Sequence, residues 1–279
     1  MSALSWNPRI NPTQPLMIVA YEGWNDAGEA STMALAHLGE QWGAVRAGTI
    51  GAEEFFDFTT YRPSVSLDAS RKRQIEWPDT KLWFARLPNG RDVVLVRGVE
   101  PQLKWRSYCS HVRELIGLTG VRLVVTLGSL LAEVPHTRPV PVYGSSQNAD
   151  VQQALHLEAS DYEGPTGIIG VLVNECEVDG VKAASLWAAV PSYVPSAPSP
   201  IAAQALVERV GAMLHVEVNV TGLAEESETY VEQISTLVAE DDQSAAYVAE
   251  LEIASDSRIL ADESADDLVH EVEKFLQGL

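Results

Sequence analysis

The first segment that could carry out chemistry is a turn between two glycines. Gly23 and Gly28 enclose the residues Trp-Asn-Asp-Ala, which gives the G-x-x-x-x-G spacing of a phosphate-binding loop. Such a loop needs a lysine directly after the second glycine, because the ammonium group reaches the β- and γ-phosphates. Here Glu29 takes that position and Asp26 adds a second negative charge, so the turn would repel phosphate. We therefore exclude a phosphate loop and interpret the segment as a strand, a tight turn and a helix.

The polar residues of this turn have two possible roles. Asn25 or Asp26 can cap the helix that follows, because a side-chain oxygen there accepts a hydrogen bond from a free amide of the first turn. A carboxylate at this position also suits the helix dipole. Glu29, three residues after Asp26, can complete a capping box. The alternative is that the same side chains contact a ligand.

Similar polar segments follow other predicted strands. In an open α/β sheet, ligands bind beyond the carboxyl ends of the parallel strands. The candidate residues at these ends are Glu22, Gly23, Trp24, Asn25, Asp26, Glu100, Gly128 and Ser129, together with Asn174 and Glu175 after a further predicted strand. Glu22 and Glu100 can face one another and act as an acid and a base if their pKa values differ. The alternative is that these carboxylates cap helices and pin loops.

A proline-rich loop at residues 133–141 holds two more candidates. His136 can transfer a proton near pH 7, and Arg138 can grip a carboxylate or a phosphate with its planar guanidinium. The prolines around them leave little backbone freedom, so both side chains are well placed for a defined contact. The alternative is that His136 and Arg138 brace the loop through hydrogen bonds.

The motifs of common enzyme classes are absent from the sequence. It contains no G-x-S-x-G, no H-E-x-x-H, no G-x-G-x-x-G and no C-x-x-C. Ser129 follows a glycine and is a possible nucleophile, but no base can be assigned to it. We therefore expect no cofactor and no metal site, and a protein that is not an enzyme.

Composition and charge narrow the class of protein further. The chain has 279 residues, of which 46% are hydrophobic, so it can build a large core. Its net charge of −20 argues against binding to nucleic acid or to an anionic membrane. The sequence contains no run of eighteen apolar residues, so no membrane span is predicted. Its first residues lack the apolar segment that is typical of a secretory signal. Its two cysteines, Cys109 and Cys176, have no metal-site spacing and are expected to be buried, reduced thiols. We expect a cytoplasmic protein.

Strands and helices are predicted to alternate along most of the chain. The apolar runs that predict strands are at 16–21, 45–50, 82–87, 93–97, 122–127, 167–173 and 185–190. Helical periodicity appears at 27–42 and 104–118, and Ser199 followed by Pro200 predicts a helix over 200–214. Between Phe55 and Trp77 the polar sequence predicts a β-hairpin that leaves the sheet. This order predicts an α/β domain with a mostly parallel sheet.

The C-terminal part differs from the rest in charge. Residues 223–279 hold 16 of the 39 acidic residues and 2 of the 19 basic residues. Apolar residues recur there at helical spacing, and the last group is Leu268, Val269, Val272, Phe275 and Leu276. We predict a core domain over 1–222 and an acidic helical extension over 223–279. The extension either folds back on the core with a solvated charged face or docks a basic partner.

Several blocks of sequence resemble those of one family. They are Tyr21-Glu-Gly-Trp-Asn-Asp-Ala-Gly28, Glu100-Pro101, Leu127-Gly-Ser-Leu-Leu-Ala-Glu-Val-Pro-His-Thr-Arg-Pro-Val-Pro141, Tyr162-Glu-Gly-Pro-Thr-Gly167 and Ser185-Leu-Trp-Ala-Ala-Val-Pro191. Together and in this order, over residues 16–214, they resemble the bacterial branch of the proteasome assembly chaperone family, the chaperone-two type, and especially its actinobacterial members. Any one block alone would be unspecific.

The resemblance implies a three-layer, phosphorylase/hydrolase-like α/β fold, similar to purine nucleoside phosphorylases, and a homotrimer. It also implies partners such as the proteasome or another protein complex. Members of the family often dock through a C-terminal hydrophobic-Tyr-any tripeptide, whereas this chain ends Gln277-Gly278-Leu279, so we do not expect docking of that kind. Some bacterial members are labelled ATP-grasp-like ligases, and the sequence gives no support for that activity.

Two functional hypotheses follow. The first is a non-catalytic assembly or interaction protein that works as a homo-oligomer. The second is a small-ligand-binding protein, or a hydrolase- or phosphorylase-like enzyme, that uses the crevice around Glu22, Asp26, Glu100, Ser129, His136 and Arg138. Fold analogy alone does not decide between them.

Overall fold

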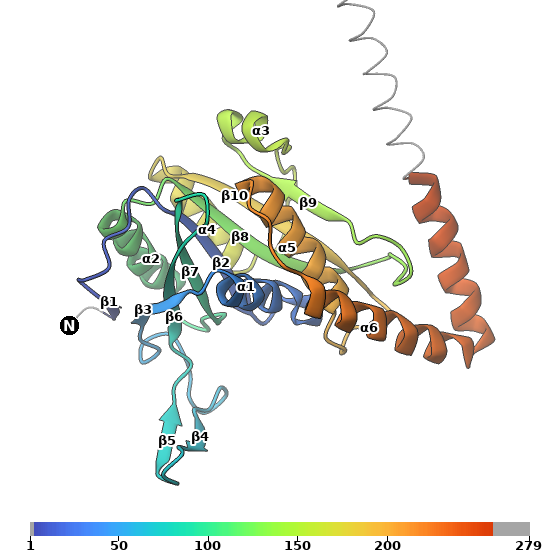
Figure 1. Ribbon diagram of the computed structural model, residues 1–279, viewed down its shortest axis with the longest axis horizontal. Helices are drawn as coiled ribbons and strands as arrows, with labels where there is room; N and C mark the ends of the chain where they lie inside the picture. Colours follow the sequence, from blue (N-terminus) through green and yellow to red (C-terminus); the bar gives the residue numbers. More distant parts are fainter. Residues whose placement is uncertain (1–2, 259–279) are drawn as a thin grey trace, which may run out of the picture.

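An eight-stranded sheet lies at the centre of the computed structural model, which describes residues 3–258 (Figure 1). Its strand order is β1-β3-β6-β7-β2-β8-β10-β9. The strands are β1 (Leu4–Trp6), β2 (Leu16–Glu22), β3 (Val45–Ile50), β6 (Thr80–Arg86), β7 (Asp92–Val99), β8 (Leu123–Ala132), β9 (Val142–Ser145) and β10 (Lys182–Pro191).

The sheet is mixed, with a parallel centre and antiparallel edges. β7, β2, β8 and β10 run parallel, whereas β1, β3, β6 and β9 join antiparallel neighbours. The predicted mostly parallel sheet is therefore correct only for its centre. β6 and β7 are joined by a tight turn in which the Leu87 amide donates to the Arg91 carbonyl and Gly90 has φ 83°. A turn this short cannot make the crossover that a parallel pair requires.

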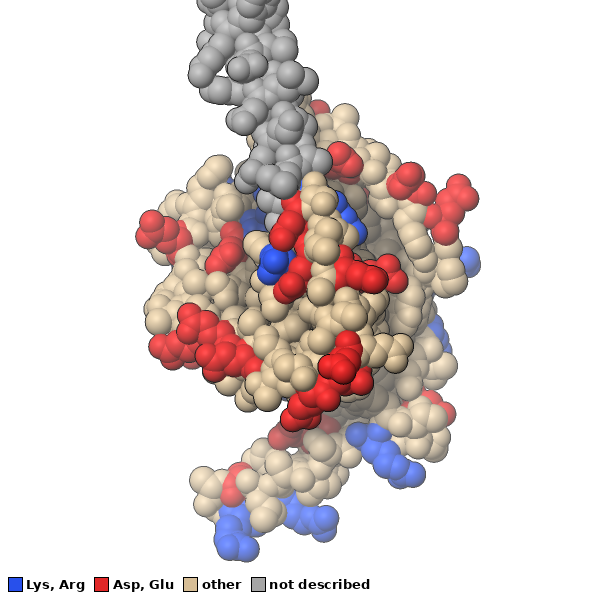
Figure 2. Space-filling model, turned by 90° about the vertical axis from the view of Figure 1, so that its right-hand side faces the viewer, with Lys and Arg blue, Asp and Glu red and all other residues tan. Residues whose placement is uncertain are grey.

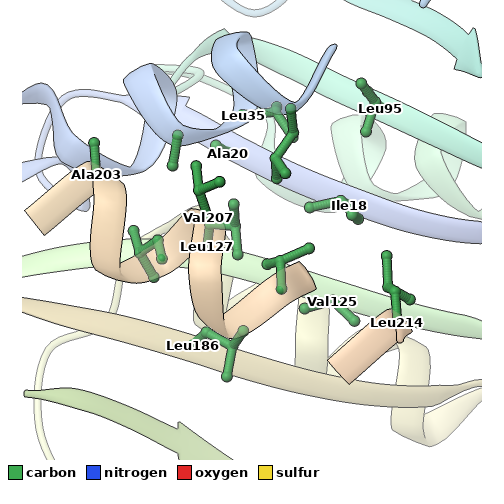
Figure 3. Close-up of a cluster of buried hydrophobic side chains, with 14 of the residues drawn as sticks. Ile18, Ala20, Leu35, Leu95, Val125, Leu127, Leu186, Ala203, Val207 and Leu214 are labelled. Carbon is green, nitrogen blue, oxygen red and sulfur yellow. The ribbon is translucent and has the colours of Figure 1, made fainter. Parts of the chain in front are cut away.

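Helices cover both faces of the sheet. α1 (Ala30–Gln41) and α5 (Pro200–Leu214) pack on one face, and α2 (Trp105–Thr119) and α4 (Ile168–Val178) pack on the other. Figure 3 shows the first layer, where Val207 and Leu214 of α5 point toward the strands. Ile18 and Ala20 belong to this cluster, while Met17 and Val19 belong to the opposite one. β2 is therefore buried on both sides, which is why its sequence is apolar without alternation.

One predicted strand is wrong. Residues 167–173 were expected to be a strand, but they begin α4, whose bounds are Ile168–Val178. A short apolar run fits a buried helix as well as a buried strand. Consequently Asn174 and Glu175 lie within a helix rather than at a strand end, and Glu175 pairs with Arg113 of α2 at 3.0 Å.

The remaining elements complete the outline. A short 3-10 helix, η1 (Ala27–Glu29), precedes α1, and α3 (Ala149–Leu155) follows β9. The predicted hairpin between Phe55 and Trp77 is confirmed: β4 (Ser64–Leu67) pairs with β5 (Arg73–Glu76) and projects from the body of the molecule (Figure 1). The helix predicted over 200–214 is confirmed as α5, with Ser199 at its N-cap and Pro200 as its first residue.

A long helix follows α5 in the C-terminal part of the chain. α6 (Thr221–Ala239) packs against α5 and buries Leu223, Tyr230 and Ile234. Residues 242–258 are also helical. The further helical pattern predicted from Leu268 onward, and the terminal tripeptide at 277–279, lie outside the described residues. Among residues 3–258, no helix has both the length and the apolarity that a bilayer crossing requires.

Candidate functional site

The carboxyl ends of β2, β7 and β8 meet at one rim of the sheet, as the sequence predicted. The Glu100 amide donates to the Glu22 carbonyl at 2.9 Å, which joins the ends of β7 and β2. The Ser129 amide donates to the Asn25 carbonyl at 2.9 Å, which joins β8 to the turn after β2. We call the segments 22–26, 100–101 and 128–129 the strand-end rim.

Glu100 holds the start of a helix. Its Oε1 accepts hydrogen bonds from Asn25 Nδ2 at 2.9 Å and from the Ile168 amide at 2.8 Å. Ile168 is the first residue of α4, and its N-cap, Gly167, has no side chain to cap it, so Glu100, which directly follows β7, does this instead. A Cβ on Gly167 would lie 2.3 Å from Asn25 Oδ1, which requires glycine there. Asn25 is fully buried, and its Oδ1 has no hydrogen-bond partner among the described residues.

Asp26 holds the start of α1. Its Oδ1 accepts from the Ser31 amide at 2.8 Å, the Ser31 hydroxyl at 2.6 Å and the Thr32 amide at 3.2 Å, and its Oδ2 accepts from the Thr32 hydroxyl. The predicted capping role of Asp26 is thus present. Glu29 does not complete a capping box, because the Asp26 amide donates to the Gly23 carbonyl instead.

Gly128 and Ser129 serve packing and turn geometry. A Cβ on Gly128 would lie 2.6 Å from the Trp187 ring, so the close approach of that ring requires glycine. Ser129 Oγ donates to the Ala27 carbonyl at 2.8 Å and thereby fixes the turn before α1. Trp24 differs from its neighbours, since 64% of its surface is exposed at the rim.

Glu22 has a different partner from Glu100. Its Oε1 accepts from Arg97 Nη2 at 3.2 Å, and it lines an open groove of about 470 Å³ between the sheet and the base of the β4–β5 hairpin. Tyr61 and Trp83 also line this groove. Partial burial raises the pKa of Tyr61, and the charge of Glu22 raises it further to a smaller extent. The two carboxylates predicted to face one another therefore have different partners.

The hydrogen-bond partners of His136 lie outside the strand-end rim. His136 is buried; its Nδ1 lies 2.7 Å from the Tyr193 hydroxyl and its Nε2 lies 2.9 Å from the Ser235 hydroxyl of α6. Burial lowers the pKa of His136, although the nearby charge of Glu252 opposes this. Burial raises the pKa of Tyr193 to about 12. The histidine thus joins the 133–141 loop to α6 in its neutral form.

Arg138 joins the same loop to the helical residues 242–258. Its Nε lies 2.7 Å and its Nη2 lies 3.0 Å from the two carboxylate oxygens of Asp256, which is a bidentate ion pair. Arg138 Nη1 also lies 3.4 Å from Glu252, which accepts a hydrogen bond from Thr137 as well. The bracing role that the sequence left open for both residues is the one that the contacts show.

The sequence did not point to the partners of this loop. Ser235, Glu252 and Asp256 lie roughly one hundred residues later in the chain, and only their helical spacing gives a signal. Glu252 and Asp256 are four residues apart, so they share one helix face that can meet a single arginine.

The thiols and acidic side chains do not form a metal centre in the described part of the chain. Cys109 and Cys176 are both free and buried, as predicted, and burial raises their pKa values to about 11 and about 12. Within residues 3–258, no three or more histidine, cysteine, aspartate or glutamate side chains lie close enough together to hold an ion.

Known proteins resemble this chain in both sequence and structure. A PAC2 family protein from Streptomyces avermitilis MA is 43% identical, with a TM-score of 0.79 over 84% of this chain and 99% of its own. A proteasome-assembly chaperone homologue from Mycobacterium tuberculosis is 41% identical, with a TM-score of 0.75 over 84% of this chain and 99% of its own.

More distant relatives share the fold. Pyrococcus furiosus PbaB, an archaeal proteasome activator, is 17% identical, with a TM-score of 0.68 over 84% of this chain and 97% of its own. No curated protein is significantly similar to the chain. The sequence model of the PAC2 family matches residues 20–238, and this match, together with the two actinobacterial structures, shows that the chain belongs to the PAC2 family.

Proposed function

We propose that this chain is a non-catalytic protein that binds other proteins during the assembly of a complex, and that it works in the cytoplasm as a homo-oligomer. The observation that carries the proposal is its 41% identity, over 84% of the chain, to a proteasome-assembly chaperone homologue. The partner class that this likeness favours is the proteasome.

The contacts of the strand-end rim support a structural role for its polar groups. Asp26 accepts four hydrogen bonds from α1, Glu100 accepts one from the start of α4, and Ser129 donates to a backbone carbonyl. A general base needs an oxygen that is free to take a proton from a substrate. The carboxylate oxygens of Asp26 and Glu100 already accept hydrogen bonds from the protein itself, so they are not free in this way.

Trp24 gives the rim a feature suited to a protein partner. Its indole is largely exposed, although the residues on both sides of it are fixed by hydrogen bonds and an ion pair. Tryptophan is among the side chains that contribute most to protein interfaces, because it buries a large area with little loss of conformational entropy. A rigid turn that presents an exposed tryptophan is therefore a suitable anchor.

A direct binding experiment tests this proposal. Purified α subunits of an actinobacterial proteasome are titrated against the full chain, and complexes are detected by native mass spectrometry. We expect a complex with the wild type and binding at least tenfold weaker for Trp24→Ala, since hot-spot residues contribute about 2 kcal/mol or more. Leu118→Ala is the matched control, because Leu118 is exposed at the end of α2. Absence of a complex with the wild type would contradict the proteasome as the partner.

The groove beside Glu22 favours a second candidate function, the binding of a small ligand. Three cationic side chains, Arg62, Lys81 and Arg97, share it with three carboxylates, Glu22, Glu76 and Asp79. Its aromatic residues offer stacking surfaces for a planar ring. A polar molecule with both charges, or a nucleoside, fits such a lining better than a purely apolar ligand does.

A thermal-shift screen with nucleosides, phosphate and common metabolites tests the second candidate. A ligand at a hundred times its dissociation constant stabilises the folded chain by about 2.7 kcal/mol. The control is Trp83→Ala, which removes one aromatic wall of the groove and should abolish the shift. If no compound raises the unfolding temperature, the compounds tested are excluded as ligands of the groove.

A further inference from the structure

The projecting hairpin has one apolar face that the described chain leaves uncovered. We call β4, β5 and the turn between them, residues 64–76, the arm. Val65 lies opposite Ile75, and Leu67 lies two residues further along the same face. Val65 is 53% exposed, and Ile75 and Leu67 are each 58% exposed. The other face is polar, and Ser66 donates there to Glu76 at 3.0 Å.

A two-stranded arm of this kind needs support from outside. An isolated pair of strands is marginally stable in water, and three or more strands or a helix packed on the pair are needed to hold it. Its only sheet partners in residues 3–258 are its own two strands. The exposed apolar face is therefore the side on which such support would pack.

The tip of the arm is basic. Arg71, Lys72 and Arg73 follow one another at the turn, and none of them forms an ion pair within residues 3–258. Arg73 lies opposite Leu67 and so projects from the apolar face itself. This basic cluster stands out because the chain as a whole has a net charge of −20.

The complementary charge lies on α6. Glu225, Glu228 and Glu232 are spaced three and four residues apart, so they form one stripe, and all three are exposed. None of them is ion-paired in the described part of the chain. Figure 2 shows basic residues on the arm at the bottom of the molecule, and acidic residues over the body above it. The two groups of charges therefore form no ion pair with one another in the part of the chain that the structure describes.

We propose that the arm of one copy of this chain docks, through its apolar face and basic tip, on the acidic stripe of α6 of a second copy. This contact joins two different surfaces, so each copy offers one arm and accepts another. Contacts of this head-to-tail kind close into a ring when the rotation between copies allows it. The inference rests on the self-association in the proposed function and names the surface that produces it.

Charge reversal on the arm is the first test. The full-length variant carries Arg71→Glu, Lys72→Glu and Arg73→Glu, and its mass is followed by sedimentation velocity over a range of protein concentrations. We expect the wild type to be an oligomer and the dissociation constant of this variant to rise on the order of a hundredfold, because like charges then face one another. The matched control reverses three exposed arginines elsewhere that form no ion pair within residues 3–258, and it should leave the oligomer intact: Arg9→Glu, Arg106→Glu and Arg122→Glu.

Restoration by a charge swap is the decisive test. A second variant, with Glu225→Lys, Glu228→Lys and Glu232→Lys, should also dissociate, whereas combining it with the reversed arm should restore the oligomer. Circular dichroism of each variant verifies folding. If a variant unfolds, the wild type alone still tests the inference, because raising the salt concentration from about 0.05 M to about 0.5 M should weaken exposed ion pairs and promote dissociation.

Each outcome separates this inference from the proposed function. A wild type that stays monomeric at every concentration overturns both the docking of the arm and the self-association. An oligomer that the arm variant leaves intact, or a swap that fails to restore two dissociated variants, overturns only the docking of the arm. Loss of proteasome α-subunit binding by the arm variant, with the oligomer intact, assigns the arm to another protein and also overturns it.

Discussion

The strand-end rim and the 133–141 loop contain similar polar residues, but those of the rim bind the helices that cover the sheet, whereas those of the loop bind helices outside them. In the rim, Asp26 and Glu100 fix the starts of α1 and α4 on the sheet that those helices cover. In the loop, His136 and Arg138 reach out to α6 and to residues 242–258, which pack outside the core. Both groups look alike in sequence, since both are polar residues among glycines and prolines.

The difference shows that the position of a polar side chain decides what its loss costs. Rim residues accept hydrogen bonds from buried backbone amides of the core, so a substitution there should lower the free energy of unfolding of the whole domain. Loop residues hold an outer layer, so a substitution there first loosens that layer. The variants below test this distinction.

The largest expected effect is that of Asp26→Ala. The change leaves the Ser31 and Thr32 amides at the start of α1 without their acceptor and should lower the free energy of unfolding by about 3 kcal/mol. Urea unfolding followed by circular dichroism measures this. Asp26→Asn is the control, since its carbonyl can keep the Oδ1 bonds, and it should retain most of the stability. Equal losses for both variants would mean that charge rather than capping matters.

A smaller loss is expected for Gly128→Ala. The added Cβ would lie 2.6 Å from the Trp187 ring, and overpacking of this kind costs about 2 kcal/mol. The matched control is Gly117→Ala in α2, where nothing lies within 4 Å of the new Cβ, and which should stabilise the chain by about 0.5–1 kcal/mol. The same unfolding measurements compare the pair. A neutral Gly128→Ala would show that the ring can move aside.

The stability of the 133–141 loop should depend on pH through His136. Burial lowers the pKa of His136, so the unfolded chain binds more protons than the folded chain below the ordinary histidine pKa of about 6.5. Stability should therefore be complete above that pH and fall as the pH drops below it. Urea midpoints at several pH values measure the trend, and His136→Gln should flatten it. The same slope in both proteins would assign the effect to another group.

The smallest effect is expected for Arg138→Gln. Its ion pair with Asp256 is at the surface, where such pairs contribute little to global stability. We expect no measurable change in the urea midpoint, but faster hydrogen exchange of the backbone amides at 242–258. Arg106→Gln is the control, because Arg106 is an exposed arginine of α2 with no ion pair among the described residues, and it should leave that exchange unchanged. A large global loss would contradict the view that the loop holds only the outer layer.

Much of the fold could be predicted from short stretches of sequence. The runs that became β2, β7, β8 and β10 are apolar without alternation, because both of their faces are covered. The run that became α4 was misassigned because its apolar residues suit either a strand or a helix. The antiparallel pairing of β6 with β7 follows from the short turn at Asn89-Gly90, a hairpin signal in the sequence that the prediction of a mostly parallel sheet did not take into account.

The sequence by itself determined the main strands and helices of the core apart from α4, and the place of polar residues at the ends of parallel strands. These depend on local periodicity and on the geometry that parallel strands share. Only the tertiary structure decided that Glu22 turns to Arg97, that Glu100 caps α4 and that His136 meets Ser235. Such contacts join residues up to about one hundred positions apart, and no local pattern encodes which distant helix will pack beside a given loop.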